Sequence, residues 1–421
     1  MTSEWREYAI GEIGDVVGGS TPSTRIAANF DGEIPWLTPK DLAGVHARFV
    51  ERGERSLSQR GLDTSSAQLV PAGSVLLSTR APIGYVAIAA NPIATNQGFR
   101  SLVLKPEFDS EFVYYWMLAN TEVLERHANG STFKELSGGS LRKIRFSAPP
   151  LGEQRAIAHI LGALDDKIEL SRRTNESLEA IARALFKSWF VAFDPVRAKS
   201  EGRDPGLPPH LADLFPDSFE DSELGEIPSG WRVGSVDDEF NLTMGQSPPG
   251  DTYNFAGDGV PFYQGRADFG FRFPTRRVYC SAPTRFAKAG DTLVSVRAPV
   301  GDVNMASEDC AIGRGLSAVR HYTGSRSYSY RFMHSIADVF AQFEAEGTVF
   351  GSIGKREFHA ITCVMPPRDL VLAYEMRVSP FDDRVEVNER ETGALAARRD
   401  ALLPKLISGD VRVDAARTPT V

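Results

Sequence analysis

The sequence predicts a mixed α/β (α+β) protein, in which two α/β domains are joined by two long antiparallel coiled-coil helices as a pseudo-twofold internal repeat. Three observations predict this fold. The chain contains two copies of one module, each copy begins with short β-type stretches between turn residues, and each copy ends in a long stretch with heptad spacing.

The two copies align at a nearly constant separation. Arg80-Ala81-Pro82 matches Arg297-Ala298-Pro299, which lies 217 residues later (297 − 80). Before residue 45 the separation is 226 (231 − 5), as for Trp5 and Trp231, so a nine-residue length change lies between the two zones. Most other residues differ between the copies. A shared frame with divergent surfaces indicates a protein that presents two different binding surfaces.

The first α/β domain is expected to contain three strands followed by a helix. The strands are marked by β-branched and apolar runs between turn residues. The helix is marked by aromatic residues that share one face at helical spacing. The expected strands are residues 74–78, 85–88 and 101–104, and the expected helix runs from Ser110 to about His127.

Both copies end in a stretch with apolar residues spaced alternately four and three apart, which is typical of a coiled coil. The first runs from Glu153 to Phe190 without a proline, and the second has its seam from Tyr374 to Leu406. Ser171 and Asn175 make the first seam polar at mid-length, as Asn388 and Thr392 do in the second. If the helices pack antiparallel, these polar layers meet and set the register. The alternative is that each helix packs only on its own domain.

These patterns divide the chain into five segments. Residues 194–230 are rich in Pro, Gly, Asp and Glu, which predicts a linker. The expected segments are a first α/β domain at 1–150, a first long helix at 151–193, the linker at 194–230, a second α/β domain at 231–365 and a second long helix at 366–410.

Composition and charge leave the partner of this chain open. The chain has 421 residues, 42% of them hydrophobic, and a net charge of −8. Residues 192–230 carry only three Lys or Arg but nine Asp or Glu, so most of the excess acid lies in the linker and each domain can still have a basic face. No apolar run is long enough for a membrane span, and no signal peptide is expected. Three scattered cysteines favour a reducing cytoplasm.

Motifs for catalysis are missing. Gly354-Lys355 lacks the rest of a phosphate-binding loop, and Ser247-Pro248-Pro249-Gly250 lacks the aromatic residue of an adenine methyltransferase loop. Asp165-Asp166-Lys167 has the form of a nuclease motif, but it lies on the expected helix and returns as Asp382-Asp383-Arg384, so we interpret it as a solvated helix face. The seven histidines have no metal-binding spacing. The sequence therefore predicts no catalytic residue, no metal site and no cofactor in this chain.

Several motifs together resemble the specificity subunit of type I restriction-modification systems. The resemblance covers essentially the whole chain, including its duplicated layout. Its motifs are Pro149-Pro150-Leu151-Gly152-Glu153-Gln154-Arg155, Phe190-Val191-Ala192-Phe193-Asp194-Pro195, Gly130-Ser131-Thr132-Phe133 and Pro228-Ser229-Gly230-Trp231.

The resemblance implies a non-catalytic DNA-reading subunit. Its two α/β domains would be target-recognition domains, each reading half of a split double-stranded DNA site. Its helices would bind two modification subunits, which methylate adenine with S-adenosylmethionine, and a restriction subunit would join for translocation and cleavage with ATP and Mg²⁺. Glu153, Gln154 and Arg155 would bind a partner subunit, although Glu153-Gln154 become Leu370-Val371 in the second copy.

Residues that stay basic in both copies are candidates for phosphate contacts, because both half-sites share the phosphate backbone. For Arg80 and Arg297 the alternative is a structural role. Residues that differ between the copies are candidates for base reading, and Gln97 suits adenine whereas Arg314 suits guanine. The expected DNA-binding residues are Arg80, Arg297, Lys40, Arg266, Gln97, Arg314, Ser131, Lys134, Thr348, Lys355 and Arg356. A scaffold that binds only proteins, and a fragment of a fused restriction enzyme, are the other functions considered.

Overall fold

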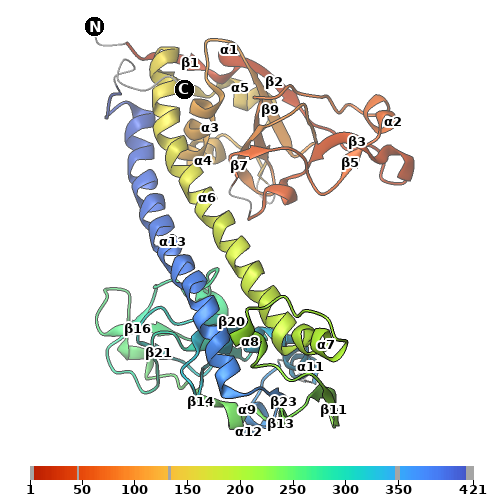
Figure 1. Cartoon of the computed structure of the whole chain (residues 1–421). Coiled ribbons are helices and arrows are strands. Elements are labelled where there is room, and N and C mark those ends of the chain that lie inside the picture. The colour runs from red at the N-terminus through yellow and green to blue at the C-terminus, as the bar shows by residue number, and fades with distance from the viewer. Residues whose placement is uncertain (1–3, 45–46, 131–133, 347–350, 414–421) are drawn as a thin grey trace. The chain divides into compact units, whose positions relative to one another are not determined.

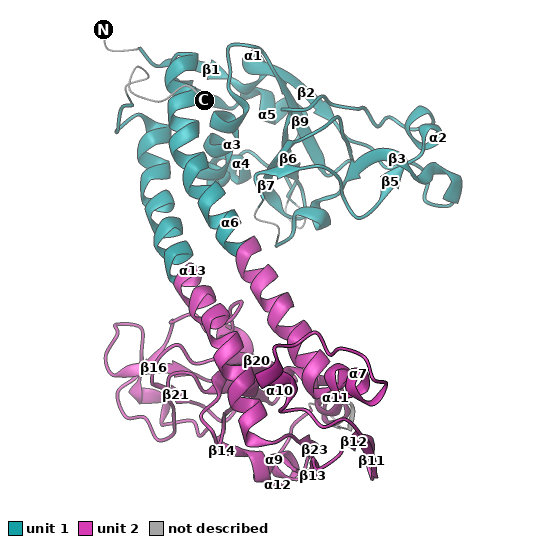
Figure 2. Cartoon of the chain, viewed as in Figure 1, with its two compact units in different colours: residues 1–172, 390–421 teal, residues 173–389 magenta. Residues whose placement is uncertain are grey.

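The computed structural model describes residues 4–44, 47–130, 134–346 and 351–413, with helices and strands labelled in Figure 1. The chain forms two compact units, shown in Figure 2. Unit 1 comprises residues 1–172 and 390–421, and unit 2 comprises residues 173–389. The long helices α6 (Leu151–Phe190) and α13 (Arg368–Ser408) each contribute one part to each unit. Each unit therefore contains one α/β region and a pair of helix segments.

The α/β region of unit 1 has a five-stranded sheet in the order β2-β9-β6-β7-β4, beside a three-stranded sheet and a strand pair. The five strands are β2 (Gly14–Gly18), β9 (Phe99–Leu104), β6 (Val75–Thr79), β7 (Ile83–Ala89) and β4 (Phe49–Val50). The other strands are β5 (Ser56–Leu57), β3 (Phe30–Leu37) and β8 (Ala94–Thr95), and the pair β1 (Arg6–Ala9) with β10 (Arg145–Ala148). The short helices are α1 (Ile10–Ile13), α2 (Gln59–Asp63), α3 (Ser110–Ala119), α4 (Thr121–Arg126) and α5 (Gly138–Lys143).

The central strand β6 shows why this sheet forms. All five of its residues are buried, and successive side chains of a strand point to opposite faces. Val75 and Leu77 join the cluster that contains Phe112 of α3, whereas Leu76 joins a second cluster with Phe99. Both faces of the sheet are therefore covered, which explains the continuous apolar run that predicted the strand.

Unit 2 repeats this plan with a four-stranded sheet in the order β14-β22-β19-β20 and a five-stranded sheet in the order β15-β17-β16-β21-β18. The first contains β14 (Phe240–Met244), β22 (Leu316–His321), β19 (Thr292–Val296) and β20 (Val300–Met305). The second contains β15 (Tyr253–Asn254), β17 (Tyr279–Cys280), β16 (Val260–Tyr263), β21 (Cys310–Ile312) and β18 (Phe286–Ala287), and β13 (Arg232–Ser235) pairs with β23 (Thr362–Met365). Its short helices are α9 (Val236–Glu239), α10 (Arg326–Ser335), α11 (Ala337–Glu346) and α12 (Lys355–His359).

The predicted strands and the predicted duplication are confirmed, with one difference in the helix. The chain does not run as one helix from Ser110 to His127, because α3 ends and α4 begins at Asn120. The Asn120 side chain donates to the carbonyl of Trp116 at 2.8 Å, which competes with continuation of the helix.

The helix segments pair antiparallel within each unit. In unit 1, Arg399 donates to Asp165 at 2.8 Å. In unit 2, the Tyr374 hydroxyl donates to the Ala182 carbonyl at 2.9 Å, and Asn388 donates to Asn175 at 2.7 Å. As the residue number rises along α6, the number of its partner on α13 falls. This is the order that antiparallel packing requires.

The polar layer predicted from the sequence is present. Asn175 and Asn388 are both buried, and their amides bind each other across the two helices. A buried amide pair fits only one register, because any slip leaves polar atoms without partners. The prediction that the two polar layers meet is therefore confirmed for this pair.

The segment expected to be a linker is more structured than its composition indicates. It forms α7 (Asp194–Ser200), α8 (Pro209–Ala212) and a hairpin of β11 (Phe219–Ser222) and β12 (Gly225–Pro228). Phe215 of this segment packs edge-on against Trp189 of α6, with ring centroids 5.2 Å apart. Its Pro and Gly residues form the turns, while the few apolar residues between them join the core of unit 2.

The interpretation of the repeated Asp-Asp motif as a solvated helix face is wrong for its first residue in both copies. Asp165 accepts a hydrogen bond from the Tyr115 hydroxyl at 2.6 Å, in addition to the one from Arg399. Asp382 is only 2% exposed and accepts from Arg272 and Arg331. These aspartates attach the α/β region of each unit to its helix segments.

Arg48 and Arg272 occupy equivalent positions in the two copies, and each binds an aspartate of the repeated Asp-Asp motif. The Ile88 N–H donates to the Arg48 carbonyl, and the Met305 N–H donates to the Arg272 carbonyl, each at 2.9 Å. Ile88 and Met305 match at the separation of 217 residues. Arg48 and Arg272 therefore correspond, although Arg48 binds the second aspartate of its motif, Asp166, at 2.9 Å, whereas Arg272 binds the first, Asp382.

Candidate nucleic-acid interface

A polar cleft of about 550 Å³ opens on the surface of unit 1. Its wall carries three arginines, two side-chain amides and one carboxylate. These side chains belong to Arg80, Arg100, Arg142, Gln68, Gln97 and Glu135. The cleft therefore combines positive charge with groups that can read hydrogen-bond patterns.

Arg80 stands where β6 ends, in the Arg-Ala-Pro turn found in both copies. A backbone bridge pairs it with Glu135, and the neighbouring Leu136 N–H donates to the Thr79 carbonyl at 2.9 Å. The Arg80 guanidinium lies 3.8 Å from the Glu135 carboxylate. The turn thus places a half-buried arginine at the mouth of the cleft.

Arg100 and Arg142 complete the basic wall. Arg100 projects from β9 between two buried residues, and it donates to the Phe99 carbonyl at 2.8 Å. Its guanidinium also lies 3.9 Å from Glu135. Arg142, on α5, donates to the Val16 carbonyl at 2.8 Å.

Gln97 is exposed in the turn before β9, and a hydrogen bond from a neighbouring loop holds its side chain. The Thr21 hydroxyl donates to its side-chain carbonyl. The strand that leads to Thr21 lies very close, because a Cβ added to Gly19 would be 2.0 Å from the Asn96 carbonyl. Only glycine permits this approach, so the backbone here determines where Gln97 stands.

The second copy repeats this loop contact with other side chains. Ser247 corresponds to Thr21, and its hydroxyl accepts from the backbone N–H of Arg314 at 3.3 Å. A Cβ on Gly245 would be 2.2 Å from the Gly313 carbonyl, which matches the close approach of Gly19. Gln97 and Arg314 are therefore equivalent in space as well as in sequence, and both are exposed.

The basic residues of the two copies are otherwise distributed differently. Arg297 is exposed at the position of Arg80 and has a backbone bridge to Ser352. Lys355 and Arg356 are exposed on α12, at positions where unit 1 has two glycines. The same frame thus carries two different patterns of charge.

The remaining expected DNA-binding residues lie outside the unit 1 cleft. Lys40 is exposed and lies 3.2 Å from Glu54, and Arg266 is exposed and lies 2.7 Å from Asp302. Lys134 lines a neighbouring cavity of about 610 Å³ together with Arg80. Two further candidates, Ser131 and Thr348, lie outside the described residues.

Two of the three residues expected to bind a partner subunit are turned inward. Glu153 is 4% exposed and Gln154 is 2% exposed. Gln154 donates to the Pro149 carbonyl and accepts from the Asp109 N–H, both at 2.9 Å, so it joins the start of α6 to the α/β region. Glu153 and Gln154 are therefore buried within unit 1, and of the three residues only Arg155 is exposed.

The corresponding pair of the second copy explains this burial. Leu370 and Val371 are both fully buried in the core of unit 2. These two positions face inward in both copies, and they are polar in the first copy and apolar in the second. The long helix therefore joins its α/β region through hydrogen bonds in unit 1 and through apolar packing in unit 2.

Across the described part of the chain, no group of three or more His, Cys, Asp and Glu side chains is placed to hold a metal ion. None of the helices in the described ranges is long and apolar enough to cross a membrane.

Sequence reasoning missed Arg100, Glu135 and Arg142. The signal for Arg100 was present, because it is the only charged residue in a run of strand residues and differs from its counterpart Ser317. Glu135 was not recognisable, because an acidic residue does not indicate a DNA contact. Its importance comes from a backbone bridge that places it between two arginines.

Comparisons with known proteins agree on one family. A family model described as the type I restriction modification DNA specificity domain matches residues 2–180. The MjaIX specificity subunit of Methanocaldococcus jannaschii is 31% identical over 432 residues, which cover 98% of this chain and 95% of that subunit. The HindI specificity subunit of Haemophilus influenzae is 24% identical, and the match covers 97% of this chain and 100% of the relative.

A solved structure shares the fold. The type I restriction-modification S subunit from M. genitalium superposes with a TM-score of 0.65 at 15% identity, and the match covers 96% of both chains. The two α/β regions and two long helices described above are thus the fold of this kind of protein. Because a relative is 31% identical along nearly its whole length, this chain belongs to the family of type I restriction enzyme specificity subunits.

Proposed function

We propose that this chain reads a bipartite DNA site, with one half-site for each α/β region. The observation that carries the proposal is the pair of equivalent exposed surfaces. Both contain an arginine at the Arg-Ala-Pro turn, while Gln97 in unit 1 is replaced by Arg314 in unit 2. A shared phosphate contact with different base contacts is what two unrelated half-sites require.

The roles of the side chains follow from this comparison. Arg80 and Arg297 contact phosphates, because they are the basic residues that the two copies share. Gln97 and Arg314 face base edges, because both are exposed on matching turns whose backbone is held by close packing. Lys134, Lys355 and Arg356 add positive charge at the edge of each surface and strengthen binding to any sequence.

The partner subunits supply the chemistry. The chain itself is non-catalytic and joins two modification subunits and a restriction subunit, which bring S-adenosylmethionine, ATP and Mg²⁺. The relatives are named specificity subunits of restriction enzymes, which supports this division of labour. Of Glu153, Gln154 and Arg155, only Arg155 is exposed, at the start of α6, and it is the one of the three that contacts a modification subunit.

The two long helices set the gap between the half-sites. Both α6 and α13 contribute to both units, and the Asn175–Asn388 pair fixes their register. Insertion of one heptad into both helices keeps the seam in phase and adds about 10 Å, or roughly three base pairs. The gap in the recognised site should lengthen by that amount while both half-sites stay the same.

The test uses the full chain with its modification subunits in cells. Sequencing of methylated adenines should show two short half-sites around a fixed gap, and the heptad variant should change only the gap. An unchanged gap would show that the helices do not determine the spacing. A single undivided site would contradict reading by two α/β regions.

A scaffold that binds only proteins is the other function that this architecture allows. The two proposals differ in their dependence on salt, because DNA binding releases counterions and weakens steeply as the salt concentration rises. Retention of double-stranded DNA by the complex at low salt, with loss at high salt, supports the first. Absence of DNA retention at every salt concentration, with partner subunits still bound, supports the scaffold.

A further inference from the structure

Glu135 lies between two arginines in the cleft of unit 1. Its carboxylate is 3.8 Å from the Arg80 guanidinium and 3.9 Å from that of Arg100. The Glu135 backbone is held by two hydrogen bonds with Asn129, at 2.8 and 3.0 Å. The backbone of Glu135 thus places a negative side chain in a basic surface, where the charge by itself opposes binding to phosphate.

Arg100 is held in place before any ligand binds. One of its terminal nitrogens donates to the Phe99 carbonyl at 2.8 Å and to the Gln97 carbonyl at 3.5 Å, while the other faces Glu135. Its side chain is 21% exposed, so the guanidinium is mostly buried but still reaches the cleft. A guanidinium fixed in this way loses little conformational freedom on binding, which suits recognition more than general attraction.

A glycine keeps this arginine accessible. A Cβ at Gly138 would lie 3.4 Å from both the Arg100 and the Arg142 guanidinium nitrogens. A larger side chain at this position would lie over both groups. The second copy has Lys355 at the corresponding position, on α12.

The second copy has neither the equivalent of Arg100 nor that of Glu135. Ser317 replaces Arg100 and is buried, with its hydroxyl donating to the Thr243 carbonyl at 3.2 Å. Ser352 replaces Glu135. Arg297, in contrast, keeps the position of Arg80. Arg100 and Glu135 therefore change together between the copies, whereas the shared arginine does not change.

We propose that Arg100 reads a guanine through its major-groove O6 and N7 atoms, and that Glu135 is the positioning residue that aims it. This inference rests on the proposed function and assigns a base to one side chain of unit 1. Glu135 also neutralises part of the charge of Arg80 and Arg100, which limits binding to DNA of other sequence. Arginine with guanine is the commonest specific pair in the major groove, and its fork matches the two acceptors.

The experiment measures the sequence preference of the complete complex with its modification subunits, by selection from DNA in which both half-sites are randomised. R100K keeps the charge but loses the fork. It should lower the preference for one G·C pair in the half-site read by unit 1 by about tenfold. The dependence of affinity on salt should stay unchanged, and so should the other half-site.

The E135Q variant separates positioning from direct contact. It keeps the shape of the side chain and removes its charge, so the two arginines are no longer neutralised. The preference for the same G·C pair should fall, while affinity for random DNA at low salt should rise several-fold. A structural role alone would lower stability and would not raise affinity for random DNA.

Matched controls come from an arginine–glutamate pair in the same unit outside the cleft. Arg145 lies 2.9 Å from Glu7, and both are exposed. R145K and E7Q should leave both half-sites and the affinity for random DNA unchanged.

Three outcomes would overturn the assignment. The first is a loss of affinity in R100K that is equal for all sequences, because it would make Arg100 a phosphate contact. The second is a changed preference in the half-site of unit 2. The third is an E135Q complex that behaves as wild type. Absence of any sequence preference in the wild-type complex would instead refute the proposed function itself.

Discussion

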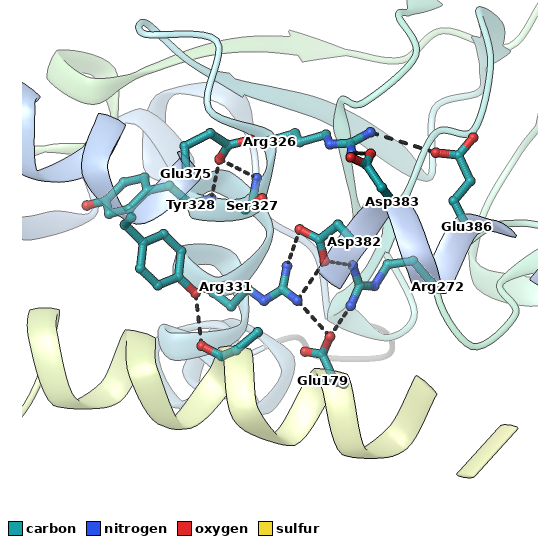
Figure 3. Close-up of polar contacts among 12 residues, drawn as sticks. Glu179, Arg272, Arg326, Ser327, Tyr328, Arg331, Glu375, Asp382, Asp383 and Glu386 are labelled. Carbon is teal, nitrogen blue, oxygen red and sulfur yellow. Dashed lines mark hydrogen bonds and ion pairs between the residues drawn. The ribbon is translucent and has the colours of Figure 1, made fainter. Parts of the chain in front are cut away.

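Replacement of Asp382 by asparagine tests how firmly the α/β region of unit 2 is attached to its helix segments. Asp382 accepts from Arg272 at 2.6 Å and from Arg331 at 2.8 and 2.9 Å, and Glu179 is the second carboxylate of the cluster (Figure 3). The side chains of Arg272, Arg331 and Asp382 are 0%, 2% and 2% exposed. All three charges are thus removed from water and depend on one another.

The expected loss of stability in D382N follows from the burial of these three charges. Without the Asp382 charge, two buried guanidinium groups share the single carboxylate of Glu179, and loss of one partner in a buried ionic cluster costs about 3–5 kcal/mol. The repeat provides a matched control in Asp165, whose side chain is 16% exposed and whose partners are Tyr115 and Arg399. D165N should cost about 1–2 kcal/mol, because it weakens hydrogen bonds without leaving a buried charge unpaired.

The assay is urea unfolding of the full-length chain at pH 7, with D382N and D165N measured against wild type. Burial raises the pKa of Asp382, but the charges of Arg331 and Arg272 outweigh it and leave the pKa below the usual value of 3.8. Because the pKa of Asp382 is lowered in the folded state, its ionised carboxylate contributes fully to the free energy of unfolding above the unfolded-state pKa. This contribution is lost as the pH falls through the folded-state pKa. The difference in the free energy of unfolding between D382N and wild type should therefore stay the same from pH 7 to about pH 5 and become smaller only in stronger acid. If D382N costs no more than D165N, the argument from buried charge is wrong.

Three further predictions concern other parts of the chain. R80A and R297A should each weaken binding to all DNA sequences and reduce the salt slope by about one, whereas an unchanged slope with lower stability would favour a structural role. N388A should cost about 1–3 kcal/mol in urea unfolding, because it leaves the buried amide of Asn175 without this partner, and leucine at both positions should restore stability. P380A should raise the melting temperature, because Pro380 is exposed inside α13 and an interior proline costs a helix up to about 3 kcal/mol; a lower melting temperature would show that the proline ring is needed.

The sequence was most informative where a periodic pattern reports a physical period. Heptad spacing predicted both long helices, because burial of one face of a helix imposes this period. The apolar run at residues 74–78 predicted a strand, because both faces of that strand are buried. The matched polar residues predicted that the polar layers of the two helices meet, and Asn175 and Asn388 do meet. These features depend on neighbours along one element, which the sequence displays directly.

The candidate interface was only partly predictable. Gln97 and Arg314 were found because the alignment of the two copies places them together, and their exposed turns agree with that expectation. The burial of Glu153 and Gln154 was not predictable, because polar residues in a motif are expected to be exposed. Exposure depends on what packs against a residue, and no local pattern encodes that.

The sequence by itself determined the duplication, the strands of the first domain and the two long helices, because each follows from repeated or periodic residues, and its motifs determined the family. Only the tertiary structure decided which polar residues meet. Arg48 and Arg272 correspond although they are 224 residues apart (272 − 48), because they lie where the alignment changes its offset. Glu135 lies 3.9 Å from Arg100 because a backbone bridge pairs it with Arg80, at the end of the neighbouring strand β6. Contacts of this kind arise from chain segments that folding brings together, so their geometry exists only in the folded protein.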